Sequence, residues 1–174
     1  MKKDAVVYDI DGTLADKTFY EHLLQDWDWE EFAKGIITAK IHQDVAKGMR
    51  ALDNHGISII LLTARPEFYR DDTKTWLKNN NLYYERLIML PEEAAMDMEE
   101  YRKIHKSRGT SYEQQYINSS QAEYKAKALK NLSEDYNIIG VYDDNHTVVD
   151  KARSMGYCAY HIDFPNTEVE QWET

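Results

Sequence analysis

The stretch Asp9–Leu14, DIDGTL, follows an apolar run at 5–8 and is the strongest indication of the fold. A short apolar run that stops at a polar turn is typical of a buried strand in a parallel sheet. Asp9 and Asp11 are separated by one residue, so at a strand end both side chains project into one cleft, and Gly12 allows the tight turn that aims them there. Two such carboxylates repel each other unless a cation or a shared proton relieves them. The stretch therefore predicts a metal site at the end of the first strand.

Apolar runs of strand length recur along the chain and alternate with segments of helical spacing. The predicted strands are 5–8, 58–62, 86–90, 138–142 and 157–162, and the predicted helices are 41–52, 71–78, 125–132 and 148–155. This alternation predicts an α/β fold in which helices flank a Rossmann-like parallel sheet.

The length of 174 residues and the absence of any linker-like tract predict a single domain over residues 1–174. Two stretches do not fit the alternation. Residues 15–40 separate the first strand from its crossover helix, and residues 91–124 separate the third strand from the next helix. Ligands of open α/β sheets bind at the carboxyl ends of the strands. We therefore expect small insertions over this edge: 15–40 as a cap, and 91–124 either as a second cover or as surface elaboration.

Residues suited to phosphate follow the second predicted strand. The Thr63 hydroxyl and the backbone N–H groups around Ala64 can hold a phosphate oxygen, and the Arg65 guanidinium can bind one through two hydrogen bonds. Taken alone, this motif is explained equally well by a Thr63 that caps the following helix instead of binding phosphate.

Acidic and basic residues complete the predicted site. Asp143 and Asp144 follow the fourth predicted strand, and hard oxygen ligands without cysteine or paired histidine select Mg²⁺ rather than zinc. Lys125, in the helix that leads to this strand, would offset the charge of a phosphorylated aspartate. Lys127 is the alternative for that role.

Together these motifs resemble the haloacid dehalogenase-like hydrolases, from Asp4 to Ile162 in consistent order. The resemblance implies that Asp9 is the nucleophile and Asp11 the general acid and base of a phosphoric monoester hydrolase. It implies that Thr63 and Lys125 hold the phosphoryl group.

The same resemblance implies the metal ligands. Mg²⁺ would bind the Asp9 carboxylate, the backbone carbonyl of Asp11 and the Asp143 carboxylate, and Asp144 would reach it through water. Within this superfamily the chain looks most like the 3′-phosphatase domain of phage-type polynucleotide kinases. Three segments of the sequence carry this likeness: residues 63–67, 141–149 and 156–158. That likeness makes Arg65 a ligand of the substrate phosphate. The chain departs from that domain in having no arginine between Asp11 and Arg50.

Composition limits the partners. The formal net charge of -10 disfavours binding along an extended nucleic-acid backbone. A small phosphorylated substrate remains compatible, with a nucleotide or a nucleic-acid 3′-phosphate terminus first and a sugar or other metabolite phosphate second. The single cysteine, Cys158, and the absence of a long apolar segment predict a cytoplasmic protein without membrane contact. A phospho-signalling receiver domain, the non-catalytic alternative, would carry its acidic residues on different strands.

Overall fold

The computed structural model describes residues 2–18, 29–97 and 110–164. The elements in chain order are β1 (Lys3–Tyr8), α2 (Trp29–Thr38), α3 (Gln43–Asn54), β2 (Ser58–Pro66), the 3₁₀-helix η1 (Glu67–Tyr69), α4 (Arg70–Asn79), β3 (Arg86–Leu90), α6 (Thr110–Asp135), β4 (Tyr136–Asp143), α7 (His146–Ser154) and β5 (Ala159–His161). Residues 92–97 form a further helical stretch. In the described part of the chain, no helix is long and apolar enough to cross a membrane.

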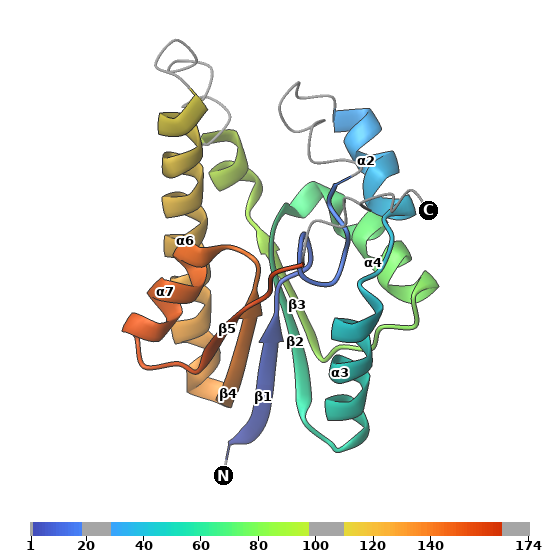
Figure 1. Cartoon of the computed structure of the whole chain (residues 1–174), viewed down its shortest axis with the longest axis vertical. Coiled ribbons are helices and arrows are strands. Elements are labelled where there is room, and N and C mark those ends of the chain that lie inside the picture. The colour runs from blue at the N-terminus through green and yellow to red at the C-terminus, as the bar shows by residue number, and fades with distance from the viewer. Residues whose placement is uncertain (1, 19–28, 98–109, 165–174) are drawn as a thin grey trace, which may run out of the picture.

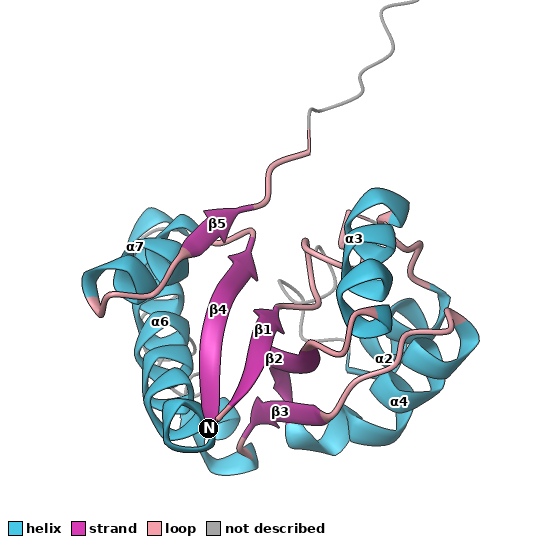
Figure 2. Cartoon of the chain, turned by 90° about the horizontal axis from the view of Figure 1, so that it is seen from below, coloured by secondary structure: helices cyan, strands magenta, loops and turns pink. Residues whose placement is uncertain are grey.

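β1 lies at the centre of a five-stranded sheet with the order β3-β2-β1-β4-β5, and every pair of neighbouring strands is parallel. Side chains alternate along β1, as the pleat of a strand requires. Val6 and Tyr8 pack into a core with α3 and α4, whereas Ala5 and Val7 pack into a second core with α6 and α7. Helices therefore cover both faces of the sheet (Figures 1 and 2), which confirms the predicted Rossmann-like fold.

Helix ends follow from local chemistry. α7 begins after Asn145, whose side-chain oxygen accepts a 2.9 Å hydrogen bond from the backbone N–H of Thr147. It is followed by Gly156, whose positive φ of 90° suits a residue without a side chain. The N-cap of α7 directly follows the acidic pair, so the start of this helix fixes the turn that carries these carboxylates.

Of the predicted elements only β3 keeps its predicted limits, and the differences at β2, α6 and β5 have clear causes. β2 continues to Pro66, because the strand resumes pairing with β3 at Leu90. α6 begins at Thr110, so residues 110–124 of the stretch 91–124 are its first turns. β5 is shorter than predicted, since it pairs with β4 only from Val141 to Asp143.

The first predicted insertion, 15–40, is attached at both ends close to the first strand. The N–H of Asp16 donates to the carbonyl of Lys40, and the N–H of His42 donates to the carbonyl of Leu14, both at 2.8 Å. α2 lies within this stretch, and residues 19–28 fall outside the described part of the chain. These backbone contacts hold residues 14–18 beside the end of β1. A cap role for 15–40 stays a prediction.

Candidate active site

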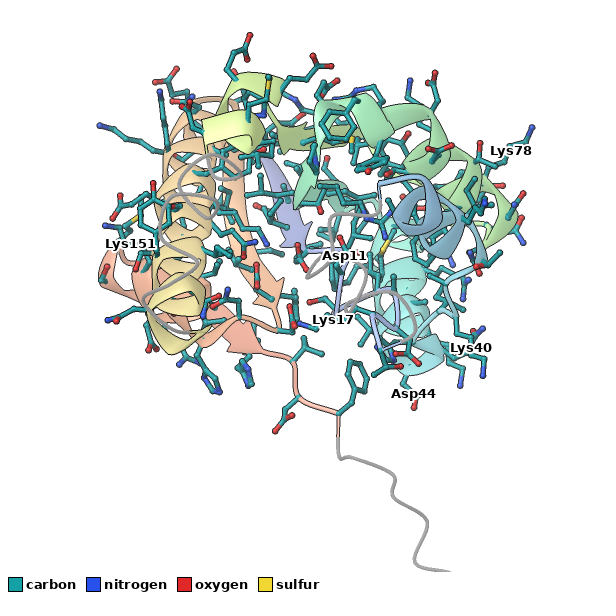
Figure 3. All side chains as sticks on the ribbon, turned by 90° about the horizontal axis from the view of Figure 1, so that it is seen from above. Asp11, Lys17, Lys40, Asp44, Lys78 and Lys151 are labelled. Atoms are coloured by element: carbon teal, nitrogen blue, oxygen red, sulfur yellow. The ribbon has the colours of Figure 1, made fainter. Side chains whose placement is uncertain are left out.

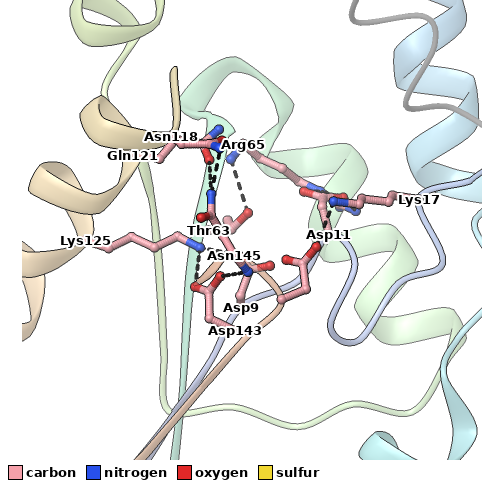
Figure 4. Close-up of polar contacts among 11 residues, drawn as sticks. Asp9, Asp11, Lys17, Thr63, Arg65, Asn118, Gln121, Lys125, Asp143 and Asn145 are labelled. Carbon is pink, nitrogen blue, oxygen red and sulfur yellow. Dashed lines mark hydrogen bonds and ion pairs between the residues drawn. The ribbon is translucent and has the colours of Figure 1, made fainter. Parts of the chain in front are cut away.

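The predicted site residues meet at the carboxyl ends of β1, β2 and β4. The chain continues from β1 to β2 on one side and places β4 on the other, so this edge contains the point where the strand order reverses, a common ligand-binding position. Figure 4 shows six of these residues close together: Asp9, Asp11, Thr63, Arg65, Lys125 and Asp143. The acidic cluster consists of Asp9, Asp11, Asp143 and Asp144, and its cationic partners among the described residues are Lys17, Arg65 and Lys125. Viewed from above, Asp11 and Lys17 lie centrally, whereas Lys40, Lys78 and Lys151 lie toward the rim (Figure 3).

Lys125 connects two buried carboxylates. Its Nζ lies 2.6 Å from Asp9 Oδ1 and 2.7 Å from Asp143 Oδ2, and all three residues are buried. Lys127 is exposed on the same helix. Of the two lysines, the structure therefore brings Lys125 into the acidic cluster, and its role toward a phosphoryl group stays a prediction.

The electrostatics of this group favour an additional cation. Burial raises the pKa of Asp9 well above its usual range despite the opposing charge of Lys125, and the nearby carboxylates of Asp143 and Asp144 raise it further. Burial also raises the pKa of Asp143, again against the effect of Lys125. For Lys125, burial alone would lower the pKa, but the two carboxylates outweigh it and raise the pKa, so the ammonium stays charged. A second positive charge here would allow both carboxyl groups to ionise.

Three carboxylates could hold a metal ion. Oxygens of Asp9, Asp143 and Asp144 all lie within 4.8 Å of one another. Asp144 packs against Gly12, where an added Cβ would come within 2.2 Å of Asp144 Oδ2. Gly12 also has a φ of 88°, so the turn needs glycine both for its backbone conformation and for the space that Asp144 occupies. An all-carboxylate donor set suits a hard divalent cation.

Lys17 is a site residue that the sequence reasoning missed. Its Nζ lies 2.7 Å from Asp144 Oδ2, and its side chain is 35% exposed. The lysine comes from the stretch that the contacts of Asp16 and His42 hold beside β1. A lysine in a predicted insertion carries no pattern that would indicate this contact.

Arg65 lies at the end of β2 with its side chain inside the protein. Its backbone N–H donates to Thr63 Oγ1 at 3.1 Å, and its guanidinium pairs with Asp11. Thr63 is fully buried next to β1, and Ala64 between them is half-buried. The predicted phosphate residues are thus adjacent to the acidic cluster, and phosphate contact by Thr63, Ala64 and Arg65 stays a prediction.

Amide side chains link α6 to the acidic pair. Asn145 donates from Nδ2 to Asn118 Oδ1 at 3.3 Å and to Gln121 Oε1 at 3.4 Å, while its backbone N–H donates to Asp143 Oδ1 at 2.9 Å. Gln121 lies one helical turn before Lys125, so both extend from one face of α6. Sequence reasoning missed Asn118 and Gln121, although their spacing with Lys125 is that of a single helix face.

The parallel sheet, the aspartates after β1 and the acidic pair after β4 define a haloacid dehalogenase-like hydrolase. Residues 3–166 match the family model described as the polynucleotide kinase PNKP phosphatase domain, and the chain belongs to this family. The chain is therefore a phosphoric monoester hydrolase, which confirms the predicted superfamily and class of enzyme. A comparison with curated proteins finds no match.

Solved structures share the fold at low sequence identity. A chain in the Pnkp1/Rnl/Hen1 RNA repair complex is 21% identical, with a TM-score of 0.65 over 95% of this chain and 44% of that one. The tungstate-bound class C acid phosphatase from Bacillus anthracis is 15% identical, with a TM-score of 0.61 over 95% and 68%. A Bacteroides thetaiotaomicron enzyme of the haloacid dehalogenase family, in complex with magnesium and phosphate, is 13% identical, with a TM-score of 0.51 over 98% and 100%. The chain spans less than half the length of the first of these.

Proposed function

We propose that the chain is a Mg²⁺-dependent phosphomonoesterase that forms an aspartyl-phosphate on Asp9 and acts on a nucleotide or a nucleic-acid 3′-phosphate terminus. The observation that carries this proposal is the buried Asp9–Lys125–Asp143 group at the end of β1, with Nζ–O distances of 2.6 and 2.7 Å. A carboxylate held in this way has a defined orientation, which nucleophilic attack requires.

The residues of the acidic cluster fit a magnesium ion. The described cluster has four carboxylates and three cationic partners, so one divalent ion would change an excess negative charge into an excess positive charge. Asp9 and Asp143 would hold it through carboxylate oxygens, together with the backbone carbonyl of Asp11, and Asp144 would reach it through water. When bound, Mg²⁺ supplies positive charge that stabilises the oxygens of a transferring phosphoryl group.

The reaction that we propose has two steps. The Asp9 carboxylate attacks phosphorus, the bond from phosphorus to the leaving oxygen breaks, and Asp11 donates a proton to that oxygen. Asp11 then accepts a proton from the water that attacks the phosphorus of the aspartyl-phosphate, and this attack releases Asp9 and inorganic phosphate. Lys125, Thr63 and the backbone N–H groups near Ala64 would bind the phosphoryl oxygens and offset their charge.

The family and the overall charge support a substrate with a single recognised phosphate. Members of the family are described as polynucleotide kinase phosphatase domains, which favours a nucleotide or a 3′-phosphate terminus. The net charge of -10 opposes long tracts of nucleic acid. A sugar or other metabolite phosphate is the second candidate, because the same charge pattern admits any small monoester.

The test of this function is phosphate release by wild-type protein, Asp9→Asn and the exposed control Asp53→Asn, each with Mg²⁺ or a chelator. The substrates are nucleoside 3′-monophosphates, 3′-phosphorylated oligonucleotides and sugar phosphates. We expect Mg²⁺-dependent release by the wild type and the control but none by Asp9→Asn, since an amide cannot form the phosphoenzyme. Wild-type turnover by Asp9→Asn, or turnover indifferent to the chelator, would overturn the proposal.

A further inference from the structure

We propose that Arg65 is a positioning residue that orients the carboxylate of Asp11 for proton transfer, and that Thr73 on α4 holds Arg65 in this orientation. This inference rests on the proposed function, because it concerns the proton transfers in the two steps above. It assigns Arg65 a role different from the phosphate contact that the sequence predicts.

The contact between Arg65 and Asp11 is a two-point interaction. Arg65 Nε lies 2.8 Å from Asp11 Oδ2, and Nη2 lies 2.7 Å from Asp11 Oδ1. Nε also lies 3.0 Å from Oδ1. Two parallel N–H···O bonds between a planar guanidinium and a planar carboxylate fix the plane of the carboxylate as well as its position. Rotation of the Asp11 side chain would break both contacts.

α4 holds the guanidinium from the opposite side. Arg65 Nη1 donates to Thr73 Oγ1 at 3.2 Å, and the guanidinium carbon lies 5.7 Å from the ring centroid of Trp76. Trp76 is itself fixed, because it is fully buried and its Nε1 donates to the carbonyl of Ala39 at 2.8 Å. Thr73 and Trp76 are one helical turn apart, so one face of α4 supports Arg65. The resulting chain of contacts runs from α4 through Arg65 to Asp11.

Exposure distinguishes the two members of the pair. The side chain of Asp11 is 24% exposed, whereas that of Arg65 is 1% exposed. A substrate that enters the site can therefore reach the Asp11 carboxylate, while the guanidinium lies beneath the surface. The N–H groups of Arg65 Nε and Nη2 are directed at the Asp11 carboxylate, and an N–H group of Nη1 is directed at Thr73. These contacts favour action of the guanidinium through Asp11 over direct contact with phosphate.

Loss of the contact between Arg65 and Asp11 should slow only the steps in which Asp11 transfers a proton. An alkoxide is a poor leaving group, so departure of a ribose oxygen needs the proton from Asp11, whereas p-nitrophenolate leaves without one. A misplaced Asp11 therefore slows aspartyl-phosphate formation from a nucleoside 3′-monophosphate but not from p-nitrophenyl phosphate. Loss of a phosphate ligand slows formation from both substrates and raises KM.

The test measures the first turnover of full-length wild type, Arg65→Lys, Thr73→Val and Thr73→Ser in excess Mg²⁺, by rapid mixing with each substrate. For Arg65→Lys we expect alcohol release from the nucleotide to slow by about 10²-fold, within the range for general acid catalysis, with the p-nitrophenol burst within about threefold of wild type. Thr73→Val should show the same selective loss to a smaller degree, about 3- to 10-fold, and Thr73→Ser should recover it because the hydroxyl is kept. KM should change less than about threefold in each variant.

Thr75→Val is the matched control, since Thr75 is an exposed threonine on the same helix and its hydroxyl donates to the carbonyl of Asp71. Its kinetics should equal those of the wild type. Equal losses with both substrates, or a raised KM with an unchanged maximal rate, would overturn the proposal and return Arg65 to the phosphate. If Arg65→Lys fails to fold, an unselective or absent effect in Thr73→Val overturns it equally. A wild type that releases neither alcohol contradicts the proposed function instead.

Discussion

Replacement of Lys125 by methionine removes the ammonium group from the acidic cluster and keeps a side chain of similar length. In the wild type this ammonium lies 2.6 Å from Asp9 and 2.7 Å from Asp143, with all three groups buried. The substitution therefore leaves two buried carboxylates without this cation. Loss of one partner from a buried ion pair costs about 3–5 kcal/mol. For a chain of this size, about 2–4 °C in Tm per kcal/mol gives an expected fall of about 6–20 °C in chelator.

Magnesium should reverse part of this loss, because the ion would lie among the same carboxylates. Removal of a competing cation should tighten Mg²⁺ binding, and each tenfold gain in affinity returns about 1.4 kcal/mol at saturating metal. The assays are thermal unfolding, which gives Tm, and urea unfolding, which gives the free energy of unfolding, for wild type, Lys125→Met and Lys127→Met, each in chelator and in Mg²⁺. Lys127 is exposed two residues further along α6, so Lys127→Met should stay within about 0.5 kcal/mol of wild type.

Two results would refute this reasoning. If Lys125→Met in chelator unfolds within about 0.5 kcal/mol of wild type, the ammonium does not stabilise the buried carboxylates. If Lys127→Met loses more stability than Lys125→Met, the assignment of the two lysines is wrong. If Mg²⁺ does not reduce the loss of stability in Lys125→Met, the ammonium group and the metal ion do not share the same carboxylates.

Further predictions concern the metal and the substrate. Gly12→Ala should lower the free energy of unfolding by at least about 1 kcal/mol and weaken Mg²⁺ binding, because the new Cβ meets Asp144; unchanged affinity in titration calorimetry contradicts this. Asp143→Ala should weaken Mg²⁺ binding more than Asp144→Ala, and equal losses would mean that both carboxylates share the ion. With 3′-phosphorylated oligonucleotides of increasing length, kcat/KM should change little, with a salt dependence of about one or two phosphate contacts; a steep slope would indicate a longer binding groove.

The sheet and the position of the site could be predicted because both depend on local patterns. Buried parallel strands are apolar along their whole length, so the runs at 5–8 and 86–90 stand out. The carboxyl ends of parallel strands share one edge, so polar residues after separate strands must meet there. Asp9 and Asp143 therefore come together, although 134 positions separate their residue numbers.

The partners of individual charges could not be predicted, because they depend on contacts that periodicity does not encode. The Lys17–Asp144 pair requires the path of the chain after Gly12, which backbone hydrogen bonds to Lys40 and from His42 determine. The pairing of Arg65 with Asp11 requires the packing of α4 behind β2. The early start of α6 was missed because polar pairs, at 114–115 and 119–120, interrupt the apolar periodicity of this helix.

The charge balance of the cluster connects the buried site with the choice of substrate. The net charge of -10 repels any polyanion at long range, yet in the proposed mechanism a phosphate monoester has to reach the carboxylate of Asp9. Among the described partners of the cluster, Arg65 and Lys125 are buried against carboxylates, so neither presents a positive surface to solvent. In the proposed function, attraction would then arise locally, from the divalent ion that the carboxylates would hold and from Lys17 at the edge of the site. Attraction of this short range suits one terminal phosphate and offers little to the neighbouring phosphates of a long chain.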